Sequence, residues 1–73
     1  MSEITIDNRG LMPPEPMVRI LSAIAEAGPG GTVVAYMERE PMMLYPELER
    51  RNCTWTFEET GDHFKLTVSV SQS

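Results

Sequence analysis

Cysteine is almost absent from this chain of 73 residues, in which Cys53 stands alone. A single cysteine cannot close an intramolecular disulfide, so the chain is not a disulfide-stapled scaffold. One unpaired cysteine suits a reducing compartment. No segment approaches the ~20 apolar residues that span a bilayer, and the first residues do not resemble the basic start of a secretion signal. We therefore expect a single cytoplasmic domain over residues 1–73, with no membrane contact.

Basic residues are also scarce, because six Lys and Arg face eleven Asp and Glu and give a net charge of −5. Binding to nucleic acid or to an anionic membrane needs a basic patch, and here the basic residues are scattered. The chain has no phosphate loop, no CxxC or HExxH motif and no paired carboxylates. His63 has no partners for a catalytic arrangement and is expected to be an exposed turn residue. We predict no nucleic-acid partner, no cofactor and no resident metal.

The periodicity of the apolar residues predicts four strands and two helices. The expected strands are Glu3 to Asp7, Thr32 to Met37, Cys53 to Glu59 and His63 to Val70, and the expected helices are Pro14 to Ala27 and Pro46 to Arg51. Turns are expected at Glu38 to Met42 and at Thr60 to Asp62. The right-handed crossover rule makes the first two strands parallel. The predicted fold class is therefore α/β (α+β), a two-layer βαβαββ sandwich in which a four-stranded mixed sheet carries both helices on one face.

Side-chain spacing also predicts which residues are buried. Met17, Ile20, Leu21 and Ile24 lie on one face of the first helix. Cys53, Trp55 and Phe57 share one face of the third strand, and Phe64, Leu66, Val68 and Val70 share one face of the fourth. These faces are expected to form the core between the sheet and the helices.

The segment Arg9 to Pro16 joins the first strand to the first helix and contains three prolines in four residues. Prolines cannot continue a strand but can open a helix, whose first N–H groups have no internal partner. Gly10 gives the backbone room to turn. We call this segment the elbow. An elbow of this kind is expected to aim helix N–H groups and the positive end of the dipole at one spot, which favours an anion or an activated nucleophile.

The elbow resembles that of the TusA/SirA-like sulfur-carrier family, whose signature is G-L-x-C-P-x-P. Gly10, Leu11, Pro14 and Pro16 match this signature, whereas Pro13 stands where the family has its reactive cysteine. The longer pattern, with Arg39-Glu40-Pro41 and Leu44 to Glu49, is similar to an uncharacterised branch of the superfamily in which that cysteine is commonly absent. The resemblance implies a bacterial protein with the two-layer fold, an unassigned function and a link to sulfur or redox metabolism.

The carboxyl ends of the two parallel strands are the expected working edge, because open sheets bind ligands there. The candidate binding residues are Arg9, Gly10, Met12, Pro13, Pro14, Glu15, Arg39, Glu40 and Tyr45. The two arginines could clamp a carboxylate, a phosphate or a sulfur oxyanion, or could pair with neighbouring acids to hold the loops. Glu15 is interpreted as dipole compensation rather than as a catalytic group. The predicted function is a noncatalytic module that binds a protein partner or a small anion.

Two alternatives remain open. Cys53 could transfer sulfur, although its place on an apolar strand face favours a buried structural thiol. The methionine-rich edge could bind a soft metal such as Cu(I) or a cofactor, but core or interface packing is the favoured interpretation. The methionines concerned are Met12, Met17, Met37, Met42 and Met43, with Met17, Met37 and one of the last two assigned to structural positions. The isomer of the Pro13–Pro14 bond is left open.

Overall fold

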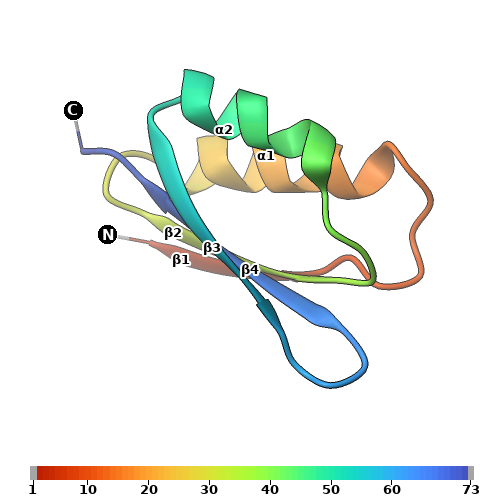
Figure 1. The fold of residues 1–73 in the computed structure, drawn as a ribbon. Coiled ribbons are helices and arrows are strands. Elements are labelled where there is room, and N and C mark those ends of the chain that lie inside the picture. The colour runs from red at the N-terminus through yellow and green to blue at the C-terminus, as the bar shows by residue number, and fades with distance from the viewer. Residues whose placement is uncertain (1, 73) are drawn as a thin grey trace.

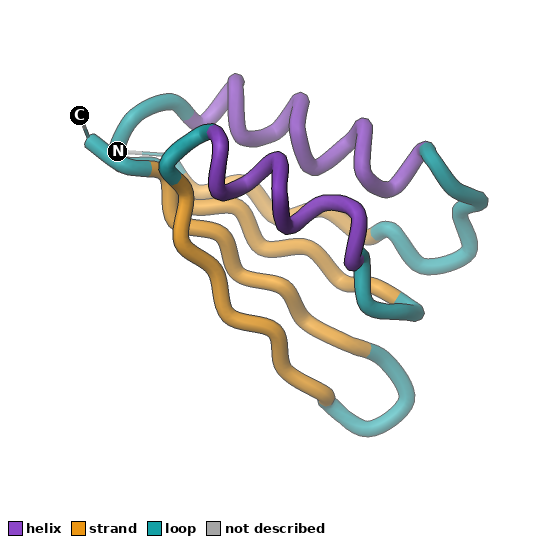
Figure 2. The backbone as a smooth tube through the Cα atoms, turned by 45° about the horizontal axis from the view of Figure 1, so that its top comes forward, coloured by secondary structure: helices purple, strands orange, loops and turns teal. Residues whose placement is uncertain are grey.

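Four strands and two α-helices form two layers in the computed structural model, which describes residues 2–72 (Figure 1). The strands are β1 (Glu3–Asp7), β2 (Thr32–Met37), β3 (Cys53–Glu59) and β4 (Phe64–Val70). The helices are α1 (Glu15–Ala27), the 3-10 turn η1 (Met42–Leu44) and α2 (Tyr45–Arg50). Both α-helices cover the same face of the sheet (Figure 2), as the sequence predicts. None of the described helices is long and apolar enough to cross a membrane.

The sheet order is β1-β2-β4-β3, and the predicted parallel pair is present. In it Ile4 lies opposite Val33 and Asp7 opposite Tyr36. The other two pairs, β2 with β4 and β3 with β4, are antiparallel. Because β1 and β2 run in the same direction, the loops that follow them leave the sheet at one edge. This confirms the mixed sheet and sets the elbow beside the loop between β2 and η1.

The ends of the elements differ from the prediction by one or two residues. Helix α1 begins at Glu15, because Pro14 has the non-helical angles φ −95° and ψ 13°. Helix α2 occupies Tyr45–Arg50 and follows directly on η1, so Met42 belongs to a helical turn rather than to the predicted loop. Strand β4 begins at Phe64, because His63 belongs to the hairpin turn.

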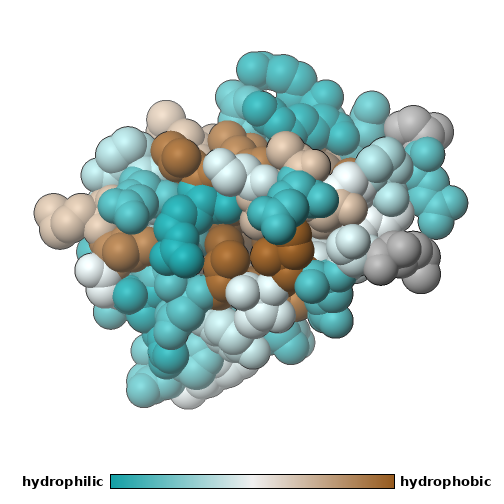
Figure 3. Space-filling model, turned by 180° about the vertical axis from the view of Figure 1, so that it is seen from behind, coloured by the Kyte–Doolittle hydropathy of each residue, from teal (hydrophilic) through white to brown (hydrophobic). Residues whose placement is uncertain are grey.

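The core fills the space between the helices and the sheet. The largest fully buried side chains come from both helical segments and the two central strands, namely Ile20, Leu44, Leu48, Leu66, Val33 and Val68. Each contributes roughly 1.5–3 kcal/mol through burial of apolar surface. Met17 and Leu21 are only half-buried against this core, where full burial was predicted, because they lie at the flank of α1. Seen from behind (Figure 3), apolar side chains remain visible among hydrophilic ones.

Gly31 lets β2 start close under the end of α1. A Cβ at this position would lie 2.7 Å from the Ala27 Cβ and 2.9 Å from the Ala27 carbonyl oxygen. No real Cβ tolerates such contacts, so only glycine allows this approach. The tight turn after α1 thus sets the height of the helix above the sheet.

Candidate functional site

The elbow follows β1 and turns at Gly10, whose φ is +84°. A left-handed backbone of this kind favours glycine. The Pro13–Pro14 bond is cis, which answers the question that the sequence leaves open. The Glu15 N–H donates to the Met12 carbonyl oxygen at 3.0 Å and closes the last turn before α1. The elbow is therefore a folded loop with its own internal hydrogen bond.

A carboxylate joins the elbow to the loop after β2. The Gly10 N–H donates to Glu38 Oε1 at 2.8 Å, across 28 positions of sequence. One step earlier, the Asn8 N–H donates to the Tyr36 carbonyl oxygen at 2.8 Å and extends the pairing of β1 with β2. The two loops predicted to share an edge are thus held together by a specific contact.

Of the two interpretations left open for Arg9 and Arg39, pairing with a neighbouring acid is the one seen at Arg9. Arg9 is engaged with Asp7: Nε lies 2.9 Å from Oδ1, and the NH2 nitrogen lies 2.9 Å from Oδ2. These bonds lower the pKa of Asp7 from its usual 3.8 to about 2, and Asp7 in turn raises the pKa of Arg9. Arg39, in contrast, makes no hydrogen bond or ion pair with any residue in 2–72. Loop-holding is therefore the role of Arg9, and Arg39 is left available.

Both loops line a half-closed cavity of about 100 Å³, the elbow cavity. Its walls are Asn8, Leu11, Pro13, Pro16, Glu38, Arg39 and Pro41. Of the candidate residues, Pro13 and Arg39 reach it, whereas Arg9, Gly10, Met12, Pro14, Glu15, Glu40 and Tyr45 do not line it. Of the other five wall residues, Leu11 and Pro16 belong to the elbow and Pro41 to the Arg39-Glu40-Pro41 loop, both of which were predicted to bind, whereas Asn8 and Glu38 were not among the candidates. Their position on the two predicted loops was the only sign of their role in the sequence.

Asn8 is the buried polar residue of this wall, with 2% of its surface exposed. Its Nδ2 donates to the Pro16 carbonyl oxygen at 3.0 Å and contacts Met37 Sδ at 3.6 Å. Its Oδ1 is buried and has no partner among the described residues. Asn8 therefore ties the end of β1 to the first turn of α1 and leaves one acceptor unsatisfied.

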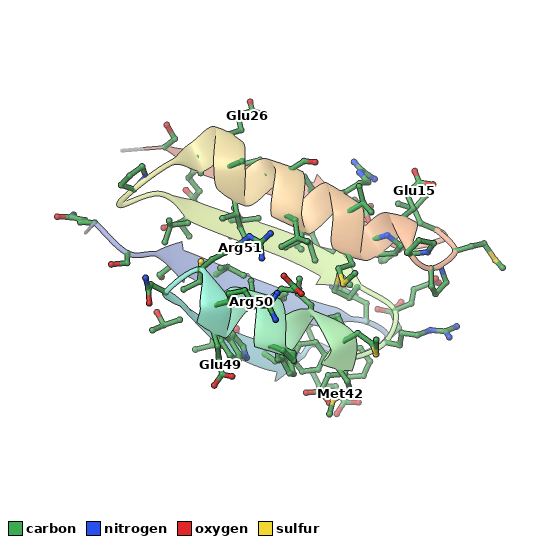
Figure 4. The ribbon with its side chains drawn as sticks, turned by 90° about the horizontal axis from the view of Figure 1, so that it is seen from above. Glu15, Glu26, Met42, Glu49, Arg50 and Arg51 are labelled. Atoms are coloured by element: carbon green, nitrogen blue, oxygen red, sulfur yellow. The ribbon has the colours of Figure 1, made fainter. Side chains whose placement is uncertain are left out.

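The N-terminus of α1 does not present the expected array of N–H groups. The Glu15 N–H is bonded to Met12, Pro16 has no N–H, and the Val18 N–H donates to the Pro14 carbonyl oxygen at 3.1 Å, so that in this turn only the Met17 N–H has no backbone acceptor among the described residues. Residues that lack or use their N–H groups cannot bind an anion through the backbone. Glu15 itself is exposed at the elbow end of α1, which is also the end at which Met42 lies (Figure 4).

Glu40 and Tyr45 form a separate contact beside the cavity. The Tyr45 hydroxyl donates to Glu40 Oε2 at 2.9 Å, and the Tyr45 ring stacks on Trp55 with centroids 5.0 Å apart. Burial and the Glu40 carboxylate raise the pKa of Tyr45. These contacts hold the loop between β2 and η1 against α2 and β3.

Cys53 lies at the far end of the sheet from the elbow. It pairs in register with Val70, whereas Met37, at the elbow end of β2, pairs with Phe64. The Cys53 thiol is buried and lies 3.8 Å from the Arg51 carbonyl oxygen. Burial raises the pKa of this thiol, against a smaller lowering by Arg51. These features are those of a structural cysteine.

The methionines divide between core and surface. Met37 is buried, as predicted, and Met17 packs at the edge of the core. The assignment of Met42 or Met43 to the core is wrong, because η1 turns Leu44 inward and leaves these two residues 63% and 81% exposed. Met12 is 79% exposed on the elbow. Three flexible apolar side chains therefore stand in solvent on the elbow and η1.

His63 differs from its predicted exposure. It is half-buried, contacts Asp62 Oδ1 at 2.8 Å through Nδ1 and meets the Tyr36 ring edge-on at a centroid distance of 5.6 Å. Tyr36 lies opposite Lys65 in the register of β2 and β4, and His63, two residues before Lys65, falls on the same face beside the Tyr36 ring. Residues 2–72 contain no cluster of three or more His, Cys, Asp or Glu that could hold a metal ion.

Comparison with known proteins gives a family and a fold. A family model described as "Uncharacterized conserved protein (DUF2249)" matches residues 5–70. No curated protein matches the chain. The structure is similar to the crystal structure of a SirA-like protein from Desulfitobacterium hafniense, with a TM-score of 0.80 and 25% identity over 93% of this chain and 97% of that one. The SirA-like fold implied by the elbow motif is confirmed.

Proposed function

This chain belongs to the DUF2249 family of uncharacterised conserved proteins, and we propose that it is a noncatalytic interaction module that binds a protein partner through the elbow and the Arg39-Glu40-Pro41 loop. The observation that carries the proposal is the cation left available on this surface. Arg39 is exposed, has no partner within residues 2–72, and lies on a loop that Glu38 fastens to the elbow.

Apolar side chains extend the same surface. Met12 on the elbow and Met42 and Met43 on η1 are exposed. Flexible methionines suit adaptable protein contacts, and an exposed arginine suits a carboxylate of the partner. The partner surface we propose is therefore apolar with at least one acidic residue.

The absence of a nucleophile supports a binding role. Pro13 occupies the position of the carriers' reactive cysteine and has neither a thiol nor an N–H. The one thiol of the chain, Cys53, is buried at the other end of the sheet. A cytoplasmic location and a partner from sulfur or redox metabolism belong to the same proposal and rest on the elbow resemblance.

The test compares matched arginine variants. The immobilised protein, its Arg39→Ala form and its Arg50→Ala form are exposed to host-cell lysate, and a captured protein is purified and titrated against the ¹⁵N-labelled chain. We expect Arg39→Ala to weaken binding about tenfold or more. Arg50 is a suitable control, because it is an exposed arginine whose ion pair, among the described residues, is with Glu47 on α2.

Two results would oppose the proposal. One is equal binding by the wild type and Arg39→Ala. The other is amide shifts that avoid residues 8–17 and 37–45 while the partner binds. A small anion that produces the elbow shifts in place of a protein would assign the surface to anion binding instead.

A further inference from the structure

The elbow cavity has an unsatisfied hydrogen-bond acceptor in its wall. Asn8 Nδ2 donates to the Pro16 carbonyl oxygen, while Asn8 Oδ1 has no partner in the part of the chain that the structure describes. Turning the amide round would set Oδ1 against the Pro16 oxygen, and two acceptors cannot bond. The unsatisfied atom of Asn8 is therefore the oxygen, which can accept a hydrogen bond from a ligand.

Glu38 adds a second acceptor to the same wall. Its Oε1 takes the Gly10 N–H, and its Oε2 has no bond to any residue that the structure describes. The start of α1 supplies few donors in return, because the Glu15 and Val18 N–H groups are used and Pro16 has none, which leaves the Met17 N–H, and Met17 does not line the cavity. The inner wall thus favours a ligand group that donates hydrogen bonds over an anion.

The remaining walls define the shape and the rim. Leu11, Pro13, Pro16 and Pro41 are apolar, and Arg39 supplies an unpaired cation. A volume of about 100 Å³ takes a group of a few heavy atoms, since one water occupies roughly 30 Å³. Flat, rigid proline walls suit a planar group of this size.

We infer that the elbow cavity binds a primary carboxamide, the side chain of a Gln or Asn in a partner peptide, with a neighbouring carboxylate on Arg39. This inference rests on the proposed function and names the group that the partner inserts. The two N–H bonds of a carboxamide match Asn8 Oδ1 and Glu38 Oε2, and its flat faces match the prolines. Asn8 Oδ1 is closed to solvent, so the inference requires the wall of the cavity to open at Asn8 when the group enters.

The first test uses a peptide series on the folded wild-type protein. The probe is Ala-Gln-Asp-Ala with an acetyl and an N-methylamide cap, and its Gln→Met analogue keeps the shape without the donors. We expect the probe to shift the Asn8 side-chain amide and the Gly10 and Leu11 amides, with Gln→Met binding about tenfold weaker or worse. An Asp→Ala analogue of the peptide is expected to bind the wild-type protein more weakly than the probe does. On the Arg39→Ala protein, the analogue and the probe should bind with the same affinity.

The second test separates a peptide from a free small amide. Acetamide, N,N-dimethylacetamide and acetate are titrated separately, and only acetamide both fits and donates. Shifts with acetamide but with no peptide would retain the carboxamide chemistry and overturn the partner peptide as its source. A stronger response to acetate than to acetamide would overturn the inference in favour of an anion.

Equal affinity for the Gln and Met peptides would also overturn it, and this result leaves the proposed function standing if Arg39→Ala still weakens partner binding. Asn8→Leu, which removes the acceptor, is expected to make the two peptides bind alike. Where that variant fails to fold, the peptide series on the wild type decides alone.

Discussion

The two arginines of the elbow surface differ in their partners, and this difference determines what each can do. Arg9 forms a bidentate ion pair with both carboxylate oxygens of Asp7, while Arg39 has no partner within residues 2–72. An exposed ion pair of this kind contributes little to stability. Its effect is local, because it holds the first residues of the elbow in place.

The Asp7–Arg9 pair predicts a titration. Asp7 is expected to titrate near pH 2 in the wild type and at a higher pH in Arg9→Ala, which keeps only the bond from the backbone N–H of residue 9 to Asp7 Oδ1, as followed by the Asp7 carboxyl carbon shift in NMR. A lowered folded-state pKa stabilises the fold above the ordinary value and loses that effect as the pH falls through about 2. The free energy of unfolding of the variant should therefore depend less on pH between about pH 4 and pH 2 than that of the wild type does.

Arg19 provides the control for this titration, because it donates to the Asp7 backbone oxygen at 3.2 Å and not to the carboxylate. Arg19→Ala should leave the Asp7 midpoint low. A midpoint near 3.8 in the wild type would show that the ion pair does not form in solution.

The burial of Cys53 predicts that its thiol reacts slowly. Because its thiol is buried and its pKa is raised, we expect it to react with a disulfide reagent at least about a hundredfold more slowly in the folded than in the unfolded chain. With a cysteine desulfurase and cysteine, the mass should show no added sulfur. Ser22→Cys, on the exposed face of α1, is the positive control and should react rapidly. Equal rates at the two positions would revive sulfur transfer through Cys53.

At the scale of elements, the bond from the Gly10 N–H to Glu38 makes the elbow and the loop after β2 one unit. We expect Glu38→Ala to raise hydrogen exchange at the Gly10 amide about two- to tenfold, because one net hydrogen bond is lost. Glu38→Gln keeps an acceptor oxygen and should preserve part of the protection. Amide exchange measured by NMR checks both variants.

Glu40→Ala is the matched control, because Glu40 lies on the same loop but accepts from Tyr45 instead. Gly10 exchange should be unchanged in it. If Glu38→Ala left Gly10 exchange at the wild-type rate, the two loops would not be coupled through this carboxylate, and the site would lose its shared frame.

The elements were largely predictable, because each depends on local periodicity. The alternation of Cys53, Trp55 and Phe57 defines a strand face within a few residues, and Gly28 with Pro29 marks the end of α1. The orientation of Met42 and Met43 could not be predicted, since it depends on which residue of a 3-10 turn faces the core.

The site was predictable only as a region. Its edge follows from the parallel pair of strands, but the role of Asn8 depends on Pro16 and Met37, which are distant in sequence. The pairing of Arg9 with Asp7 was one of two open interpretations, and nothing in the residue pattern separates them. Long-range hydrogen bonds therefore decide which members of the predicted region line the cavity.

At the scale of the whole molecule, the chain measures 34 × 20 × 17 Å, with the elbow and Cys53 at opposite ends of the sheet. Arg39, the exposed methionines and the elbow cavity all lie on the elbow, the loop that follows β2, and η1. A sulfur-transfer route through Cys53 would need a second site at the opposite end of the sheet. The surface there is an open hollow lined by Glu49, Cys53, Thr54 and Trp55. The arrangement favours one binding surface.

The same core supports both ends, and this predicts how a core variant behaves. Leu48 on α2 is fully buried, and Leu48→Ala should lower the free energy of unfolding by about 2–5 kcal/mol. A chain of this size has a total of roughly 4–11 kcal/mol, so the variant should be close to the limit of folding. Val18→Ala, at a position 52% exposed on α1, is the control and should change stability by less than about 1 kcal/mol.

Urea unfolding followed by two probes tests whether α2 and the sheet unfold together. Trp55 fluorescence reports the contact of β3 with α2, because its ring stacks on Tyr45, while far-ultraviolet circular dichroism reports the helices and strands as a whole. Coincident midpoints in the wild type and in Leu48→Ala are expected of a single cooperative core. A fluorescence midpoint at lower urea in Leu48→Ala would show that α2 separates first, and the contacts that hold the loop between β2 and η1 through Tyr45 would then open independently of the sheet.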